Sequence, residues 1–95
     1  MRRLEELLDG ISVVNIQGPL NIEVCQIQFD SRQIKKGDLF VAQRGVHVDG
    51  HTFIEKALEL GAIAVVCEEF PVDLKKEITY IKVDDASYVL GLLAS

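Results

Sequence analysis

The polar side chains best suited to bind a small molecule gather in two segments of this 95-residue chain. The first is Phe29-Asp30-Ser31-Arg32, which directly follows a predicted strand, and the second is the glycine-bounded loop Gly45-Val46-His47-Val48-Asp49-Gly50-His51, which precedes a predicted helix. Domains of the α/β class place ligand sites at strand ends and helix starts. We therefore expect these two loops to form a ligand site.

The first loop offers a hydroxyl, a carboxylate and a guanidinium within three residues. The Ser31 hydroxyl can donate and accept, so it suits the edge of a heterocycle or the cap of a turn. Asp30 can accept from the backbone N–H two residues on and so shape the loop. Arg32 can pair with Asp30 or Asp38, or contact an anionic ligand. Chemistry alone leaves both the loop-stabilising and the ligand-binding interpretations open.

The second loop presents Val46, His47 and Val48 between two glycines, Gly45 and Gly50. Glycines permit close backbone approach, so such a loop could hold a flat ring and offer backbone hydrogen bonds. The alternative is an ordinary connection from strand to helix.

Two histidines and Asp49 lie within five residues, but we predict no metal site there. Gly50 interrupts any helix that would bring His47 and His51 onto one face, and no cysteine is near.

No catalytic residue is predicted in the chain. Ser31 lacks the G-x-S-x-G setting of a hydrolase nucleophile, and no G-x-x-x-x-G-K-[ST] loop is present to bind ATP. Cys25 and Cys67 stand in apolar surroundings, which predicts two reduced, buried thiols. A disulfide or a reactive thiol is the alternative.

The net charge of −5 argues against nucleic acid as a partner. The stretch from Asp30 to Arg44 differs, because its four positive and two negative side chains sum to +2. These charged residues are Arg32, Lys35, Lys36 and Arg44 against Asp30 and Asp38. Either a small anionic ligand is received there or the segment is a solvated loop of mixed charge.

The length predicts one domain over residues 1–95. No apolar run approaches the roughly 18 residues of a membrane span, and Leu4-Glu5-Glu6 interrupts any signal-peptide pattern. We therefore expect a cytoplasmic chain.

Hydrophobic periodicity predicts an α/β alternation. The first half is expected to hold a helix over 2–9, strands over 11–16, 22–29 and 39–42, and a polar, hairpin-like loop between the last two. A phase shift near Cys25 suggests a bulge in the strand over 22–29.

The second half begins with a helix over 52–60. Thr52 and Glu55 match a capping box, Asp49 is the competing N-cap, and Gly61 suits a left-handed C-cap. The continuous apolar run over 62–67 predicts a strand covered on both faces. A strand over 78–83 and a last helix capped by Asp84 or Asp85 follow. That helix reaches Ser95 without a stop signal, so we expect a longer chain.

The ordered set of motifs resembles the amino-terminal domain of the Mur ligases over the whole chain. The motifs are Asp30-Ser31-Arg32, Lys36-Gly37-Asp38-Leu39-Phe40-Val41-Ala42, Gly45, Asp49-Gly50-His51, Phe53-Ile54, Ala57 and Gly61-Ala62-Ile63-Ala64-Val65-Val66-Cys67-Glu68. The resemblance implies a small α/β domain with a mixed sheet of short strands between helices. It is strongest to the branch that adds the third amino acid, diaminopimelate or lysine, to UDP-N-acetylmuramoyl-L-Ala-D-Glu. Another branch shares the D-[ST]-R and D-G-H elements.

The resemblance also implies a substrate and a set of contacts. This domain would bind the UDP part of the UDP-N-acetylmuramoyl-dipeptide, with no cofactor of its own, while the remainder of the polypeptide would bind ATP and magnesium. The implied substrate contacts are Phe29, Ser31, Val46, His47 and Val48, and the implied supporting residues are Asp30, Arg32, Gly45, Asp49 and Gly50. Two alternatives are a free-standing UDP-binding or interaction module without ligase activity, and a small enzyme that uses Cys25 or Cys67.

Overall fold

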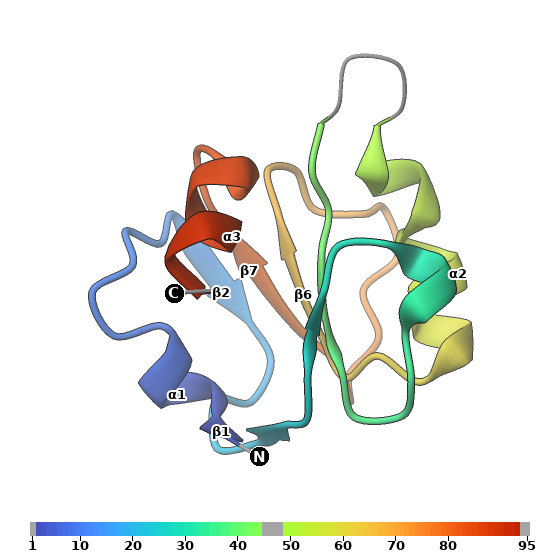
Figure 1. The fold of residues 1–95 in the computed structure, drawn as a ribbon, viewed down its shortest axis with the longest axis horizontal. Helices are drawn as coiled ribbons and strands as arrows, with labels where there is room; N and C mark the ends of the chain where they lie inside the picture. The colour runs from blue at the N-terminus through green and yellow to red at the C-terminus, as the bar shows by residue number, and fades with distance from the viewer. Residues whose placement is uncertain (1, 45–48, 94–95) are drawn as a thin grey trace.

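The computed structural model describes residues 2–44 and 49–93, which form a mixed five-stranded sheet between layers of helix (Figure 1). The strand order is β2 (Asn15–Gln17), β7 (Thr79–Lys82), β6 (Ala64–Cys67), β5 (Leu39–Val41) and β4 (Ile27–Gln28). β4, β5, β6 and β7 are parallel, and β2 pairs antiparallel with β7. The predicted α/β class and mixed sheet are confirmed.

Helices cover both faces of this sheet, so its central strands are apolar on both sides. α1 (Leu4–Leu7) and α3 (Ala86–Leu93) pack on one face, and α2 (Ile54–Leu60) packs on the other. Successive residues of β5, β6 and β7 alternate between two buried clusters. One row across the three strands is Phe40, Val65 and Tyr80, and the next is Val41, Val66 and Ile81. The predicted double burial of the run over 62–67 is confirmed.

The amino-terminal half differs from the expectation because a second, two-stranded sheet takes part of it. β1 (Arg2–Arg3) pairs antiparallel with β3 (Glu23–Val24), so the first helix is confined to Leu4–Leu7. The strand predicted over 22–29 is divided into β3 and β4, and the phase shift marks the point at which the chain leaves one sheet for the other. The strand predicted over 11–16 lies later, at Asn15–Gln17.

The hairpin-like connection predicted before β5 is wrong. Ile27 pairs with Leu39 and Gln28 with Phe40 in a parallel register, and the connection contains the 3-10 turn η1 (Ser31–Gln33). Parallel pairing brings the carboxyl ends of β4, β5, β6 and β7 to one edge of the sheet. The two candidate loops therefore begin at the same edge, which lies at the top of Figure 1.

The helix predicted over 52–60 begins with the 3-10 turn η2 (Gly50–Phe53) and continues as α2. Asp49 caps it, since its carboxylate accepts from the His51 N–H, and the capping box of Thr52 and Glu55 does not form. Gly61 ends α2 with φ +115°, as predicted. The last helix is capped by Asp85, whose carboxylate accepts from Tyr88 N at 3.1 Å.

Within the part of the chain that the structure describes, no helix is long and apolar enough to cross a membrane.

Candidate ligand-binding site

A pocket of about 480 Å³ opens at the carboxyl edge of the sheet and joins the two candidate loops. Its lining consists of the whole first motif and three residues of the β5-to-α2 connection, with one side chain from β5. These residues are Phe29, Asp30, Ser31, Arg32, Phe40, Gln43, Gly50 and Phe53. The sequence predicts a common site for these loops, and the structure brings the first loop beside Gly50 of the second.

Two aromatic rings are left open to this pocket. The exposed fractions are 63% for Phe29 and 40% for Phe53. Large rings are usually buried because of their apolar area, so their exposure beside a hollow suits an apolar, planar ligand. Phe53 is not among the site residues that the sequence predicts. It stands three positions after Gly50, at the end of the turn that Asp49 caps, and this turn places the Phe53 side chain beside the pocket.

Ser31 supplies the polar group of the pocket. The residue is only 7% exposed, and its hydroxyl has no hydrogen-bond partner among the described residues. It stands at the start of η1, immediately beyond the Asp30 cap. The hydroxyl is therefore held in place by the turn while its donor and acceptor capacity remains available to a ligand.

Asp30 and Arg32 shape this loop. Asp30 accepts from Arg32 N at 3.0 Å, which is the predicted bond two residues on, and from Arg32 Nε and Nη2 at 3.1 and 2.8 Å. The Arg32 side chain, and then its backbone N–H, lower the pKa of the Asp30 carboxyl, and Asp30 in turn raises the pKa of Arg32. Arg32 lines the pocket, but its charge is already paired.

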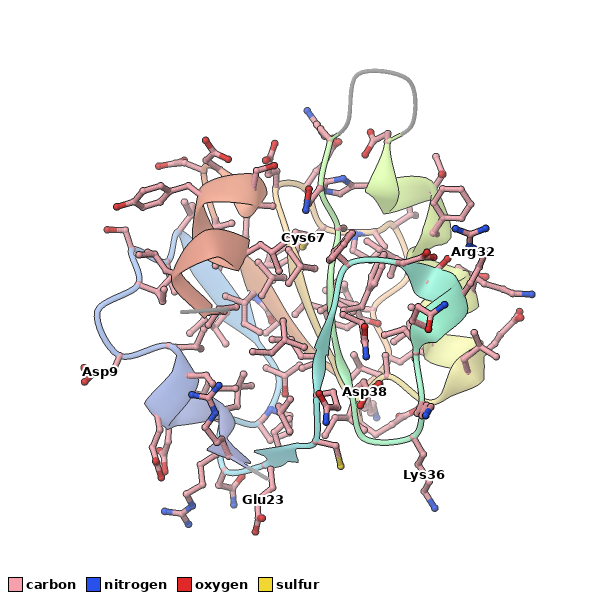
Figure 2. All side chains as sticks on the ribbon, viewed as in Figure 1. Asp9, Glu23, Arg32, Lys36, Asp38 and Cys67 are labelled. Carbon is pink, nitrogen blue, oxygen red and sulfur yellow. The ribbon has the colours of Figure 1, made fainter. Side chains whose placement is uncertain are left out.

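The positive charges predicted to receive an anion do not converge. Arg44 contacts three carboxylates, with Nη2 3.0 Å from Glu69 Oε2 and Nε 3.7 and 3.8 Å from Asp49 and Glu68. Lys36 lies beside Gly61, at the opposite edge of the sheet (Figure 2). Parallel pairing separates Lys36 from the pocket, and the ion pairs neutralise the arginines.

The stem of the second loop is closed by close backbone contacts. Arg44 and Asp49 form an isolated antiparallel bridge, and Gly50 N donates to the Gln43 carbonyl oxygen at 2.6 Å. Gly45, Val46, His47 and Val48, the other predicted members of the site, lie outside the described residues. Their predicted roles stay predictions.

His51 has a role that the sequence reasoning missed. Its Nε2 accepts from the N–H groups of Glu68 and Glu69 at 2.9 and 3.3 Å, and its Nδ1 lies 2.7 Å from Asp49 Oδ1. The backbone N–H of His51 is the main cause of the lowered pKa of the Asp49 carboxyl. The sequence shows Asp49-Gly50-His51 as a motif. The residues that donate to His51 lie 17 and 18 positions further along the chain, so no local pattern could reveal them.

Residues 2–44 and 49–93 contain no group of three or more His, Cys, Asp or Glu side chains that could hold a metal ion. Neither cysteine is in a disulfide. Cys67 is buried as predicted, and burial raises the pKa of its thiol to about 11. Cys25 is exposed, which corrects the prediction, because it stands where the chain passes between the two sheets.

A second, larger cavity of about 630 Å³ adjoins the pocket. It lies between α1, β3 and α3, and shares Phe29 and Gln43 with the first pocket. The sequence motifs contribute only Phe29 to it, and Ser87 and Leu90 of α3 stand among its other lining residues.

Residues 23–95 match the model of the Mur ligase family, catalytic domain. A UDP-N-acetylmuramoyl-L-alanyl-D-glutamate--2,6-diaminopimelate ligase of Phocaeicola vulgatus is 47% identical over 93 residues, which are 98% of this chain and 19% of that protein. A UDP-N-acetylmuramyl-tripeptide synthetase of Roseiflexus is 40% identical over 93 residues, 98% of this chain and 18% of that protein. The chain thus spans about a fifth of these relatives.

Solved structures show the same fold. MurF from Acinetobacter baumannii superposes with a TM-score of 0.80 at 28% identity, over 97% of this chain and 20% of its own. MurF from Thermotoga maritima, in complex with ADP, superposes with a TM-score of 0.62 at 33% identity, over 73% of this chain and 16% of its own.

Proposed function

This chain belongs to the Mur ligase family, and on that premise we propose that it is the domain that binds the UDP part of a UDP-N-acetylmuramoyl-peptide in a peptidoglycan ligase. The pocket at the carboxyl edge of the sheet carries the proposal, because it is lined by the whole first family motif and by Gly50 of the second.

The chemistry of the pocket suits a uracil ring. Phe29 and Phe53 offer apolar, aromatic surface to a flat heterocycle, and the Ser31 hydroxyl can pair with a polar edge of the base or with a phosphate oxygen. Because Arg32 and Arg44 are paired with carboxylates, we assign affinity here to the ring and to neutral hydrogen bonds. The diphosphate would be met by Val46, His47 and Val48, largely through their backbone, and by the remainder of the polypeptide.

The tripeptide-forming branch, MurE, is our preferred assignment. The relatives that carry the name of a diaminopimelate ligase or a tripeptide synthetase are 47% and 40% identical to this chain, against 28% and 33% for the MurF structures. The reaction would add diaminopimelate or lysine to UDP-N-acetylmuramoyl-L-Ala-D-Glu in the cytoplasm. A MurF-type ligase is the alternative within the family.

The role of this domain would be anchoring. ATP and magnesium would be bound elsewhere in the polypeptide, where the substrate carboxylate forms an acyl phosphate that an amine then attacks. Holding the distant UDP group positions that carboxylate and converts binding energy into orientation. The 95 residues contain no P-loop, so we expect them to be inactive alone.

Calorimetric titration of the full-length protein with UDP-N-acetylmuramoyl-L-Ala-D-Glu tests the proposal. We expect UDP alone to compete with this substrate and ATP not to displace it. Phe53→Ala should weaken binding by about 5-fold, the scale of roughly 1 kcal/mol for a lost aromatic contact. Tyr88→Ala is the matched control, because it removes a ring that is 67% exposed on α3 and does not line the pocket.

Failure of UDP to compete would overturn the proposal. Equal effects of Phe53→Ala and Tyr88→Ala would show that the UDP group does not bind in this pocket. Binding of UDP without ligation in the presence of ATP and diaminopimelate or lysine would favour the free-standing module.

A further inference from the structure

His51 is joined through both ring nitrogens to two separate parts of the chain, and its side chain is only 13% exposed. We propose that His51 is a positioning residue of the uridine pocket, which holds η2 against the carboxyl end of β6 without touching the ligand. The inference rests on the proposed function of that pocket.

The hydrogen bonds determine the state of the ring. Nε2 faces the N–H donors of Glu68 and Glu69 at 2.9 and 3.3 Å, so it must present a lone pair. Nδ1 faces the Asp49 carboxylate at 2.7 Å, which is an acceptor, so the proton lies on Nδ1. His51 is therefore a neutral imidazole of one tautomer, and each nitrogen has one fixed role.

One side of this connection reaches the pocket through the backbone. Asp49 accepts from His51 N at 2.9 Å, which makes the turn that begins η2. Gly50 and Phe53, at the two ends of η2, line the pocket, and Gly50 N donates to Gln43, which also lines it. His51 itself does not line the pocket, so any influence on the ligand passes through these neighbours.

The other side of the connection is itself fixed. The Glu68 carboxylate accepts from Ala86 N at 2.9 Å, at the start of α3. Arg44 contacts the carboxylates of Glu68, Glu69 and Asp49 across the same edge. The N–H groups that His51 accepts from thus belong to a segment held by α3 and by Arg44, which makes them a firm support for η2.

Two substitutions separate the links. In His51→Gln the amide oxygen reaches about as far from the backbone as Nε2 and can accept from Glu68 N–H. In His51→Asn the amide reaches only to the position of Nδ1. It can therefore keep the hydrogen bond to the Asp49 carboxylate, but the Glu68 N–H at the end of β6 loses its acceptor. We expect His51→Asn and His51→Ala to raise the KM for the UDP substrate by about 10-fold, the scale of a buried donor left unpaired. His51→Gln should stay within about 3-fold of the native protein, and the KM for ATP should not change in any variant.

A spectroscopic measurement tests the same inference without a ligand. In histidine-labelled protein the ¹⁵N shifts of the imidazole should show a protonated Nδ1 and an unprotonated Nε2, with the signals assigned by their loss in His51→Gln. Ile81→Val is the stability control, since it shortens a buried side chain on the far face of the sheet. It should lower the melting temperature without raising the KM.

The outcomes separate the two proposals. No UDP competition in the native protein would overturn the proposed function. With native binding intact, the opposite tautomer, or an unchanged KM in His51→Asn and His51→Ala, would overturn the role of His51 alone. An equal rise in KM for Ile81→Val would show that the KM follows general stability, and this result would also overturn the positioning role of His51.

Discussion

The amide nitrogen of Gly50 donates a hydrogen bond to the carbonyl oxygen of Gln43, with 2.6 Å between the two atoms. The contact closes the stem of the 45–48 loop and sets two lining residues of the pocket side by side. A side chain at this position has no room, because a Cβ on Gly50 would lie 2.6 and 2.8 Å from the backbone O and N of Gln43. Backbone atoms cannot turn aside as a flexible side chain can.

Gly50→Ala should therefore lower both stability and substrate binding. We expect the free energy of unfolding to fall by about 1–3 kcal/mol, the range for overpacking a close contact. Urea denaturation measures it. Gly91→Ala is the control, because a Cβ on this α3 residue would meet no atom of the described residues within 4 Å apart from the nearby helix backbone, and alanine there should be neutral or stabilising. Equal stability of Gly50→Ala and the native protein would contradict the close approach.

Ser31→Ala should weaken binding of the UDP substrate by about 5-fold, which corresponds to one lost hydrogen bond of roughly 1 kcal/mol. The hydroxyl is free of other partners among the described residues, so its removal should change the melting temperature little. Calorimetric titration measures the affinity. The control is Ser87→Ala, which removes a hydroxyl from the larger cavity beside the pocket. If the affinity falls in Ser87→Ala but not in Ser31→Ala, the ligand binds in that larger cavity and not in the pocket.

The Asp30–Arg32 pair should make stability depend on pH on the acidic side. Hydrogen bonds from the Arg32 side chain and backbone lower the pKa of Asp30 from 3.8. A lowered folded-state pKa stabilises the fold above the unfolded value, and this contribution is lost as pH falls through the folded value. Asp30→Asn should therefore be less stable than the native protein at about pH 7, and the difference should shrink toward about pH 3.

Chemical denaturation at the two pH values measures that difference. Asp9→Asn serves as the control, because the exposed Asp9 carboxylate has no ion-pair partner among the described residues. A gap between Asp30→Asn and the native protein that stays constant with pH would show that the pair contributes nothing as an ion pair.

The two thiols should react at very different rates. Cys25 is exposed, whereas Cys67 is fully buried and its pKa is raised to about 11 by burial. Because the thiolate is the reactive form, iodoacetamide should modify Cys25 in the native protein and Cys67 only after unfolding. Mass spectrometry of the digested protein identifies the modified residue. Fast modification of Cys67 in the native state would contradict its burial and would support the alternative of a small enzyme that uses this thiol.

Local patterns were enough for the features that depend on near neighbours in the chain. The continuous apolar run around Val65 predicted a strand buried on both faces, and Gly61 predicted the end of α2. The hydrogen bond from Arg32 N to Asp30 followed from side-chain reach over two residues. The same reasoning placed Phe29 and Ser31 at a strand end, where the structure has a pocket.

Long-range pairing decided the rest, because it depends on which strand lies beside which. The parallel register of Ile27 with Leu39 replaced the expected hairpin and brought both loops to one edge of the sheet. It also carried Lys36 to the opposite edge and left Arg44 among three carboxylates, so the local excess of positive charge disappeared.

The sequence by itself determined the family and the α/β class and predicted the first loop of the candidate site, since these are carried by the order and spacing of residues along the chain. Only the tertiary structure decided that Phe53 lines the pocket, that Cys25 is exposed, and that His51 accepts a hydrogen bond from Glu68 N–H. Each of these depends on contacts between segments far apart in the chain, and no periodicity or turn chemistry within one segment encodes them.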